Sequence, residues 1–150
     1  MVKNELSVTI NRPIQEDFDY VSNLQYGPQW QTGLVEVRQI TQGAPAAGSQ
    51  FASARKFLGR KLEAVIEIIA FEPNRKIVIK SPSGSVPFEE SLLFEPAAGG
   101  TQLTTHITLH TSGFMGLAEP LIAGSLQREM ESDLGNLKAL LEHRVPVVPS

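Results

Sequence analysis

The chain contains no cysteine among its 150 residues, so disulfides, thiolate metal sites and a cysteine nucleophile are all excluded. It has no run of Lys or Arg, and its net charge is −3 with the two signs interspersed. Nucleic acid and an anionic membrane surface are therefore not expected partners. No apolar stretch approaches the length of a transmembrane span, and Met1 to Glu5 lacks the apolar core of a signal peptide. We expect a cytoplasmic protein without integral membrane association.

Motifs that carry chemistry are also missing. There is no GxGxxG or Walker loop, and no Ser or Thr lies in a nucleophile elbow or beside a matched His. His106 and His110 lie four apart in a predicted strand, which separates them by roughly 13 Å, too far to share one ion. Both are expected to face solvent, and His143 is expected in the last turn of a helix. The sequence thus predicts no metal site and no cofactor.

The chain does contain one long amphipathic segment, from Gly113 to Arg144. Apolar residues recur there every three or four positions, which predicts one helix with a continuous apolar stripe. The first turns, from Phe114 to Ile122, have almost no polar face and are expected to be covered by protein or to line a cavity. Pro120 would lie in the first turn or would kink an earlier start. The stripe consists of Leu126, Met130, Leu134, Leu137 and Leu141.

Upstream of this helix the pattern is strand, turn, strand. Alternation of apolar and polar residues predicts strands over 6–10, 34–42, 51–58, 62–71, 77–79, 86–94 and 103–111, with short helices over 14–21 and ending near Trp30. The connections between the later strands are short, which requires antiparallel neighbours. We therefore predict an α+β fold of about seven antiparallel strands, with two short helices after the first strand. Residues 1–144 would form a single domain and 145–150 a tail.

A twisted antiparallel sheet with one buried face curls, and a long helix can occupy its concavity. One helix seldom fills such a space, so we expect a cavity near the apolar end of the helix. Alternation places several sets of side chains on the inner face: Phe51, Ser53, Arg55 and Phe57; Leu62, Ala64, Ile66, Ile68 and Ala70; Phe88, Glu90, Leu92 and Phe94; and Leu103, Thr105, Ile107 and Leu109.

The order of elements and several short phrases resemble a known group. These phrases are Arg12-Pro13 before Phe18-Asp19-Tyr20-Val21, Trp30 before Val35-Glu36-Val37, Phe71-Glu72-Pro73 with Arg75, Phe94-Glu95-Pro96, and Asp133-Leu134 with Leu137-Lys138. The chain resembles the polyketide cyclase/dehydrase-like branch of the START-like (SRPBCC, Bet v 1-like) helix-grip superfamily. The resemblance implies a sheet that grips the last helix around a pocket for a lipid, polyketide or other apolar small molecule. It implies no shared catalytic residue, because members range from carriers and sensors to cyclases.

Two inward charges are the main candidates for chemistry. Glu90 shares a strand face with Phe88, Leu92 and Phe94, and an inward carboxylate must be paired, protonated or bound to water. Arg55 lies between Phe51 and Phe57 and is its expected partner. The pair would orient a ligand head group or act as a general acid and base. Alternatively, the strand register places both side chains outside.

Tyr26 and Trp30 either form an aromatic rim at the mouth of the pocket or, in the case of Trp30, plug the base of the short helices. Three functions stay open: a carrier or sensor of an apolar small molecule, a cyclase or dehydratase acting on a carbonyl compound, and an accessory module whose main surface is a protein partner, possibly a second copy in a homodimer. We favour the first, because the polar set lacks a base and nucleophile pair. The predicted ligand-binding residues are Tyr26, Trp30, Phe51, Arg55, Phe57, Phe88, Glu90, Leu92, Thr105, Phe114, Leu117 and Leu121.

Overall fold

The computed structural model describes residues 1–84, 87–111 and 114–143, without the side chains of residues 82–84, 114 and 115. The two ends of the predicted long helix, Gly113 and Arg144, and the predicted tail 145–150 lie outside the described residues. Within the described part no helix is long and apolar enough to cross a membrane.

The core of the structure is one seven-stranded antiparallel sheet with the spatial order β1-β7-β6-β5-β4-β3-β2. Each strand from β2 to β7 pairs with the strand before or after it in sequence, as the short connections require, and β1 pairs with β7. The strands are β1 (Val2–Ile10), β2 (Leu34–Gln39), β3 (Gln50–Phe57), β4 (Arg60–Glu72), β5 (Lys76–Gly84), β6 (Phe88–Ala97) and β7 (Gly100–Leu109).

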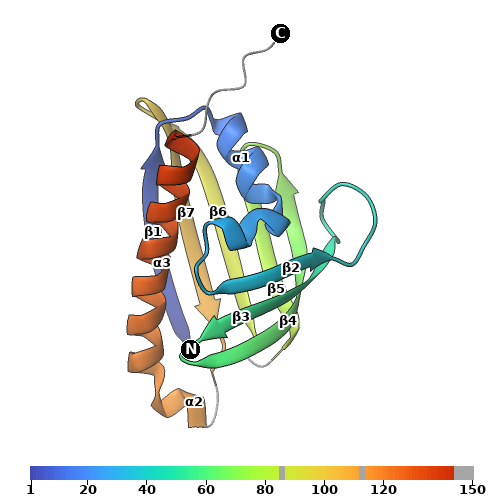
Figure 1. Cartoon of the computed structure of the whole chain (residues 1–150), viewed down its shortest axis with the longest axis vertical. Coiled ribbons are helices and arrows are strands. Elements are labelled where there is room, and N and C mark those ends of the chain that lie inside the picture. The colour runs from blue at the N-terminus through green and yellow to red at the C-terminus, as the bar shows by residue number, and fades with distance from the viewer. Residues whose placement is uncertain (85–86, 112–113, 144–150) are drawn as a thin grey trace.

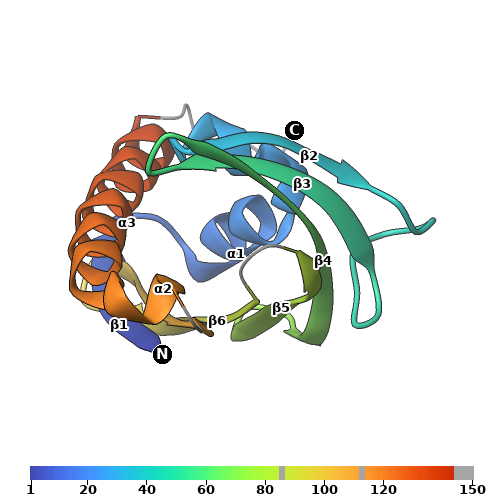
Figure 2. The ribbon, with the colours of Figure 1, turned by 90° about the horizontal axis from the view of Figure 1, so that it is seen from below.

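The sheet curls strongly, so that its two edge strands, β1 and β2, approach opposite sides of the last helix (Figures 1 and 2). Register shifts interrupt the pairing of β4 with β5 between Val65 and Glu67 and between Ile68 and Ala70. Irregularities of this kind bend a strand and increase its twist. Ile69 is exposed, as alternation after the buried Ile66 and Ile68 places it on the outer face.

Two short helices follow β1, as predicted. Helix α1 (Ile14–Ser22) begins directly after Pro13, and the 3-10 helix η1 (Leu24–Gln29) ends at Trp30. Phe18 of α1 is fully enclosed and packs edge-on against Phe71 and Phe94 of the sheet. Helix α1 therefore closes one end of the concavity, at the top of Figure 1.

The predicted long helix is present in two pieces, α2 (Phe114–Leu117) and α3 (Glu119–Glu142). The break falls at Ala118, and Pro120 occupies the first turn of α3, where its missing N–H costs no hydrogen bond. Leu126, Met130, Leu134, Leu137 and Leu141 are all buried, so the predicted stripe is the face that packs inward.

Helix α3 is held from two sides. Towards β1, Lys138 Nζ donates to the carbonyl oxygen of Thr9, and Arg12 donates to the carbonyl oxygens of Leu141 and Glu142 at the C-terminal end of the helix. Towards the other edge, the Asn136 amide donates to the carbonyl oxygen of Trp30. The helix thus closes the gap between the two ends of the curled sheet, which leaves an enclosed interior.

The apolar interior consists of two separate clusters. The larger joins α1, the sheet and the C-terminal half of α3 through residues such as Phe51, Leu92 and Leu137. The smaller lies at the opposite end and consists of Val2, Leu109, Ile122, Leu126 and Met130, with Phe57, Phe88 and Ile107 packed partly against it. The candidate site lies where the inner face carries charged side chains.

Candidate functional site

A hollow of about 490 Å³ lies between α3 and the end of the β3–β4 hairpin. Its volume is within the range of small-molecule sites, roughly 300–1,000 Å³. Apolar and polar groups share its wall, so it suits a ligand that is apolar with one polar end. The lining residues are Thr32, Gly33, Lys56, Phe57, Leu58, Ser125, Arg128 and Glu129.

Arg55 lies next to this hollow, where it pairs with the lining residue Glu129. Its guanidinium donates to Glu129 Oε1 at 2.9 Å and to Gln31 Oε1 at 2.6 Å, and both carboxylate and guanidinium are partly enclosed. Two hydrogen bonds from a rigid planar group fix its position. Arg55 therefore connects β3, the loop before β2 and α3 at one point.

Asp133 lies one turn after Glu129 on α3 and anchors the same loop. Its Oδ1 accepts from the backbone N–H of Thr32 at 3.1 Å and from the Thr32 hydroxyl at 3.2 Å. The neighbouring Gly33 leaves no room for a side chain, because a Cβ there would lie 2.2 Å from Glu129 Oε1 and 2.9 Å from the carbonyl oxygen of Lys56. The close approach of this loop to α3 thus requires glycine.

Three carboxyl groups share this one guanidinium. Burial raises the pKa of Glu90 to about 7, Arg55 opposes the rise and Asp133 adds to it. Burial likewise raises the pKa of Glu129 and of Asp133, with Arg55 opposing in both cases. One positive charge compensates three negative ones poorly in a medium that screens weakly, and Glu90, whose pKa is about 7, changes its protonation near neutral pH.

Glu90 is surrounded by protein yet keeps part of its surface accessible. That accessible surface must then face the interior rather than bulk solvent. On the adjacent strand, Thr105 Oγ1 is buried and finds no hydrogen-bond partner in the described part of the chain. Thr105 pairs with Leu92, two residues beyond Glu90 on the same face, so the two polar groups are diagonal neighbours.

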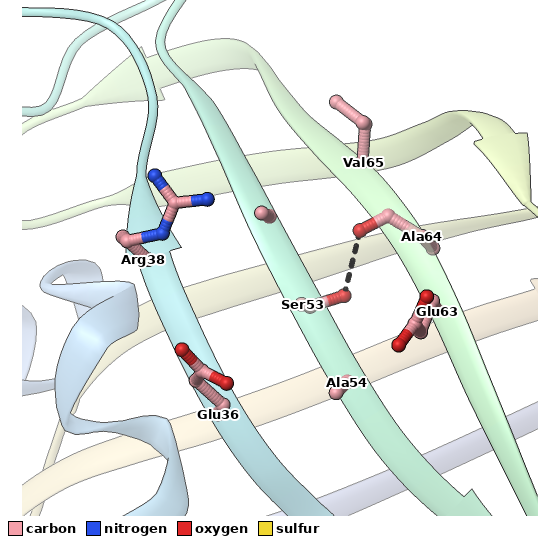
Figure 3. Close-up of a pocket in the computed structure, with 8 residues that line it drawn as sticks. Glu36, Arg38, Ser53, Ala54, Glu63, Ala64 and Val65 are labelled. Atoms are coloured by element: carbon pink, nitrogen blue, oxygen red, sulfur yellow. Dashed lines mark hydrogen bonds between the residues drawn. The ribbon is translucent and has the colours of Figure 1, made fainter.

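A second hollow, of about 410 Å³, lies on the outer face of β2, β3 and β4 (Figure 3). Ala52 and Ala54 form its floor, because small side chains there leave a depression between Glu36 and Arg38 on one strand and Glu63 on another. The Ser53 hydroxyl is occupied by the carbonyl oxygen of Ala64, 3.1 Å away. This hollow has an open, charged rim and no enclosed polar group, and it is the weaker candidate.

The predicted ion pair between Arg55 and Glu90 is wrong, because Arg55 pairs with a different carboxylate. Both side chains do lie on the inner side, but Arg55 forms its ion pair with Glu129 of α3. Arg55 is near enough to Glu90 to oppose the rise of its pKa. The prediction of a single charged pair is also wrong, since Glu129 and Asp133 belong to the same cluster.

The predicted aromatic and apolar lining divides into two groups. Phe57 lines the hollow, and Phe88 packs beside it in the smaller cluster. Phe51 and Leu92 are enclosed in the larger cluster, away from the hollow. Trp30 is also buried in the larger cluster, as expected if it plugs the base of the short helices and does not form a rim. Tyr26 is exposed and stacks on Tyr20 with ring centroids 5.1 Å apart.

Protein does not cover Leu117 and Leu121, whose side chains are 85% and 61% exposed, so for these two residues contact with an apolar ligand stays a prediction. Leu121 precedes Ser125 by one turn of α3 and shares its side of the helix, next to the buried stripe of Ile122 and Leu126, whereas Leu117 lies in α2 before the break at Ala118. Ile122 is buried as expected. The side chain of Phe114 lies outside the described residues.

Sequence reasoning missed Glu129, Asp133, Gln31 and Thr32. Asp133 had a readable signal, because it follows Met130 by three residues and precedes Leu137 by four, which places a carboxylate within the apolar stripe. Glu129 and the loop residues had none, since their roles depend on the approach of η1 and α3. The solvent-facing positions predicted for His106 and His110 are confirmed.

The comparisons with known proteins agree with the predicted family and fold. The sequence profile of a family described as "Polyketide cyclase / dehydrase and lipid transport" matches residues 1–142. No curated protein matches the chain.

Solved structures with the same fold include the ZhuI aromatase/cyclase from a Streptomyces species, with a TM-score of 0.79 and 16% identity over 97% of this chain and 96% of that one. TTHA0849 from Thermus thermophilus has a TM-score of 0.78 and 19% identity, covering 93% and 95%. A START superfamily protein from Mycobacterium smegmatis has a TM-score of 0.77 and 14% identity, covering 93% and 97%. At these identities the likeness establishes the helix-grip fold.

Proposed function

Because the chain belongs to the polyketide cyclase/dehydrase and lipid transport family, we propose that it carries or senses one apolar small molecule, bound in the hollow between α3 and the β3–β4 hairpin. Family and fold support either hydrophobic ligand binding or a cyclase role. The choice between them rests on the residues of this chain.

The observation that carries the proposal is the ion pair between Arg55 and Glu129, because Glu129 lines the hollow. Phe57 and Leu58 offer apolar contacts on one side, while Glu129 with its partner Arg55 offers hydrogen bonds on the other. A cavity with mostly apolar contacts and a few convergent polar groups orients a ligand by its polar end. We therefore expect a ligand whose oxygen-bearing end meets Arg55 and whose apolar body fills the hollow.

A fluorescence titration with 11-(dansylamino)undecanoic acid tests binding in the hollow. Ser125→Trp places a large ring inside it and should abolish the emission change that wild-type protein produces, while the urea unfolding midpoint stays close to that of the wild type. Glu131→Trp is the matched control, because position 131 is exposed on α3 and does not line the hollow. Equal affinity of all three proteins for the probe would contradict the proposed site.

The role of Arg55 is tested with a pair of ligands. Arg55→Met should weaken binding of a long-chain fatty acid about tenfold, the loss of one hydrogen bond to a charged group. Binding of the corresponding alcohol should change less. An equal loss for acid and alcohol would show that Arg55 supports the fold and does not contact the head group.

The second candidate function is catalysis on a carbonyl compound, and the pKa of Glu90 near 7 favours it. A carboxyl with this pKa can accept and return a proton at neutral pH, which enolisation next to a carbonyl requires. The test is deuterium exchange of an apolar cyclic ketone in D2O, followed by proton NMR. Catalysis predicts exchange that Glu90→Gln removes, whereas a carrier gives only the background rate.

A further inference from the structure

The end of the molecule that contains the hollow also exposes leucines. Leu58, at the tip of the β3–β4 hairpin, is 49% exposed and lines the hollow itself. Leu121 lies one turn before Ser125 of α3, which lines the opposite wall, and Leu117 ends the preceding helix α2. Helix α2 and the start of α3 lie towards the lower end of the molecule in Figure 1, as does the β3–β4 hairpin. An apolar surface therefore borders the opening.

The conformation of Leu58 is unfavourable for its side chain. Leu58 has φ 51° and the following Gly59 has φ 77°, so both residues of the turn are left-handed. Such turns strongly favour Asn-Gly, because a branched apolar side chain is strained at positive φ. Exposure means that Leu58 gains little from burial in return. A strained and exposed residue that does not serve the fold indicates an external contact.

The charged residues of the hairpin tip around Leu58 are all cations, and Glu129, which lines the hollow, is paired with Arg55. Residues 56–61 contain Lys56, Arg60 and Lys61 and no acidic residue, and all three cations are exposed. Lys61 lies 3.5 Å from Glu63, whereas Lys56 and Arg60 form no ion pair within the described residues. Arg128 adds a fourth cation across the hollow. Glu119, the carboxylate near Leu117 and Leu121, is occupied by the terminal ammonium of Met1.

We propose that this end of the molecule docks on the surface of an anionic lipid bilayer, with the side chain of Leu58 inserted between head groups. Exposed apolar side chains ringed by cations are suited to such an interface. A second copy is a poorer partner, because a two-fold contact centred on Leu58 would bring the cations Lys56 and Arg60 close to their own equivalents. The net charge of −3 argued against membranes, but docking depends on the local charge.

The protein would dock on the bilayer whatever the hollow binds. The benefit of docking rests on the proposed function: an apolar ligand could pass between bilayer and hollow without crossing water, because the hollow opens at the docked surface.

Sedimentation with sucrose-loaded vesicles tests the inference on the full chain. Vesicles of phosphatidylcholine with about one-third phosphatidylserine should pull down the protein, and pure phosphatidylcholine should not. Replacing Lys56 or Arg60 by Gln should weaken binding roughly fivefold each. Leu58→Asn should weaken it about tenfold or more, while the urea midpoint stays equal or rises because Asn tolerates positive φ.

Ile40→Asn is the matched control. Ile40 is 48% exposed, close to Leu58 in exposure, but lies beyond the opposite end of β3, and its substitution should leave vesicle binding unchanged. Equal sedimentation with both vesicle types, or wild-type binding by Leu58→Asn, would overturn the proposal. So would a dimer in analytical ultracentrifugation that Leu58→Asn dissociates, because it would assign the surface to a second copy. The probe titration compares wild type, Ser125→Trp and Glu131→Trp without vesicles, so docking and ligand binding fail separately.

Discussion

The pKa of Asp17 is controlled by the burial of its side chain. It is fully enclosed in the first turns of α1, and neither carboxyl oxygen has a hydrogen-bond partner within the described residues. The nearby Thr101 hydroxyl lowers its pKa but already donates to the carbonyl oxygen of Arg12. Burial dominates and raises the pKa of Asp17 to about 7. The carboxylate form is therefore costly above that pH.

Asp17→Asn tests this cost through stability. A carboxyl with a raised pKa binds more protons in the native than in the unfolded state, so it destabilises the fold as pH rises from about 4 through about 7. In the wild type, ionisation of Asp17 should lower the unfolding free energy by roughly 2–4 kcal/mol over this pH range. Asp17→Asn lacks this contribution, so its unfolding free energy should fall by that much less between pH 5 and pH 8, as measured by urea titration. Parallel losses in both proteins would contradict the account.

Arg55 and Glu129 should be energetically coupled. Both are only partly enclosed, so we expect a coupling free energy of about 1 kcal/mol rather than the larger value of a fully buried pair. The cycle compares wild type, Arg55→Met, Glu129→Gln and the double variant by urea unfolding at pH 8. A coupling free energy indistinguishable from zero would mean that the ion pair contributes nothing to holding α3 against β3.

At the scale of elements, α3 has two different faces. Its inward stripe fills the concavity of the sheet, whereas the side that carries Leu121 and Ser125, in line with Leu117 of α2, borders the hollow and the solvent. Stability should therefore depend on which leucine of the same segment is removed.

Leu134→Ala should lower the unfolding free energy by roughly 2–5 kcal/mol, because it leaves a cavity in the larger cluster. Leu121→Ala is the matched control and should change it by less than about 0.5 kcal/mol. Denaturant titration of both variants gives the comparison. Similar losses at the two positions would show that the exposed face of α3 is covered in solution.

At the scale of the whole molecule, the strand order and the buried stripe of α3 could be predicted because both depend on local patterns. Short connections require antiparallel neighbours, and spacings of three and four define the helix face. The inward side of Arg55 and Glu90 followed from alternation in the same way. The partner of Arg55 did not, because it depends on how far the curled sheet brings β3 towards α3, which no local pattern specifies.

The same limit explains the exposed leucines. An apolar run at 114–122 predicts burial only if protein is present on every side, and position along the chain does not reveal where the sheet ends. The alternation pattern assigns Leu58 to a strand, since a turn at Gly59 gives no indication that the preceding residue also has positive φ. Strain and exposure become visible only in three dimensions.

The central claim, that an apolar ligand occupies the hollow beside Arg55, is tested most directly by native mass spectrometry of freshly purified protein. We predict a wild-type species heavier than the polypeptide by one small organic molecule, or a 1:1 complex after incubation with 11-(dansylamino)undecanoic acid. Glu131→Trp should behave in the same way, and Ser125→Trp should show the bare polypeptide mass under both conditions. A wild-type spectrum that contains only the bare mass, before and after incubation, would contradict the claim.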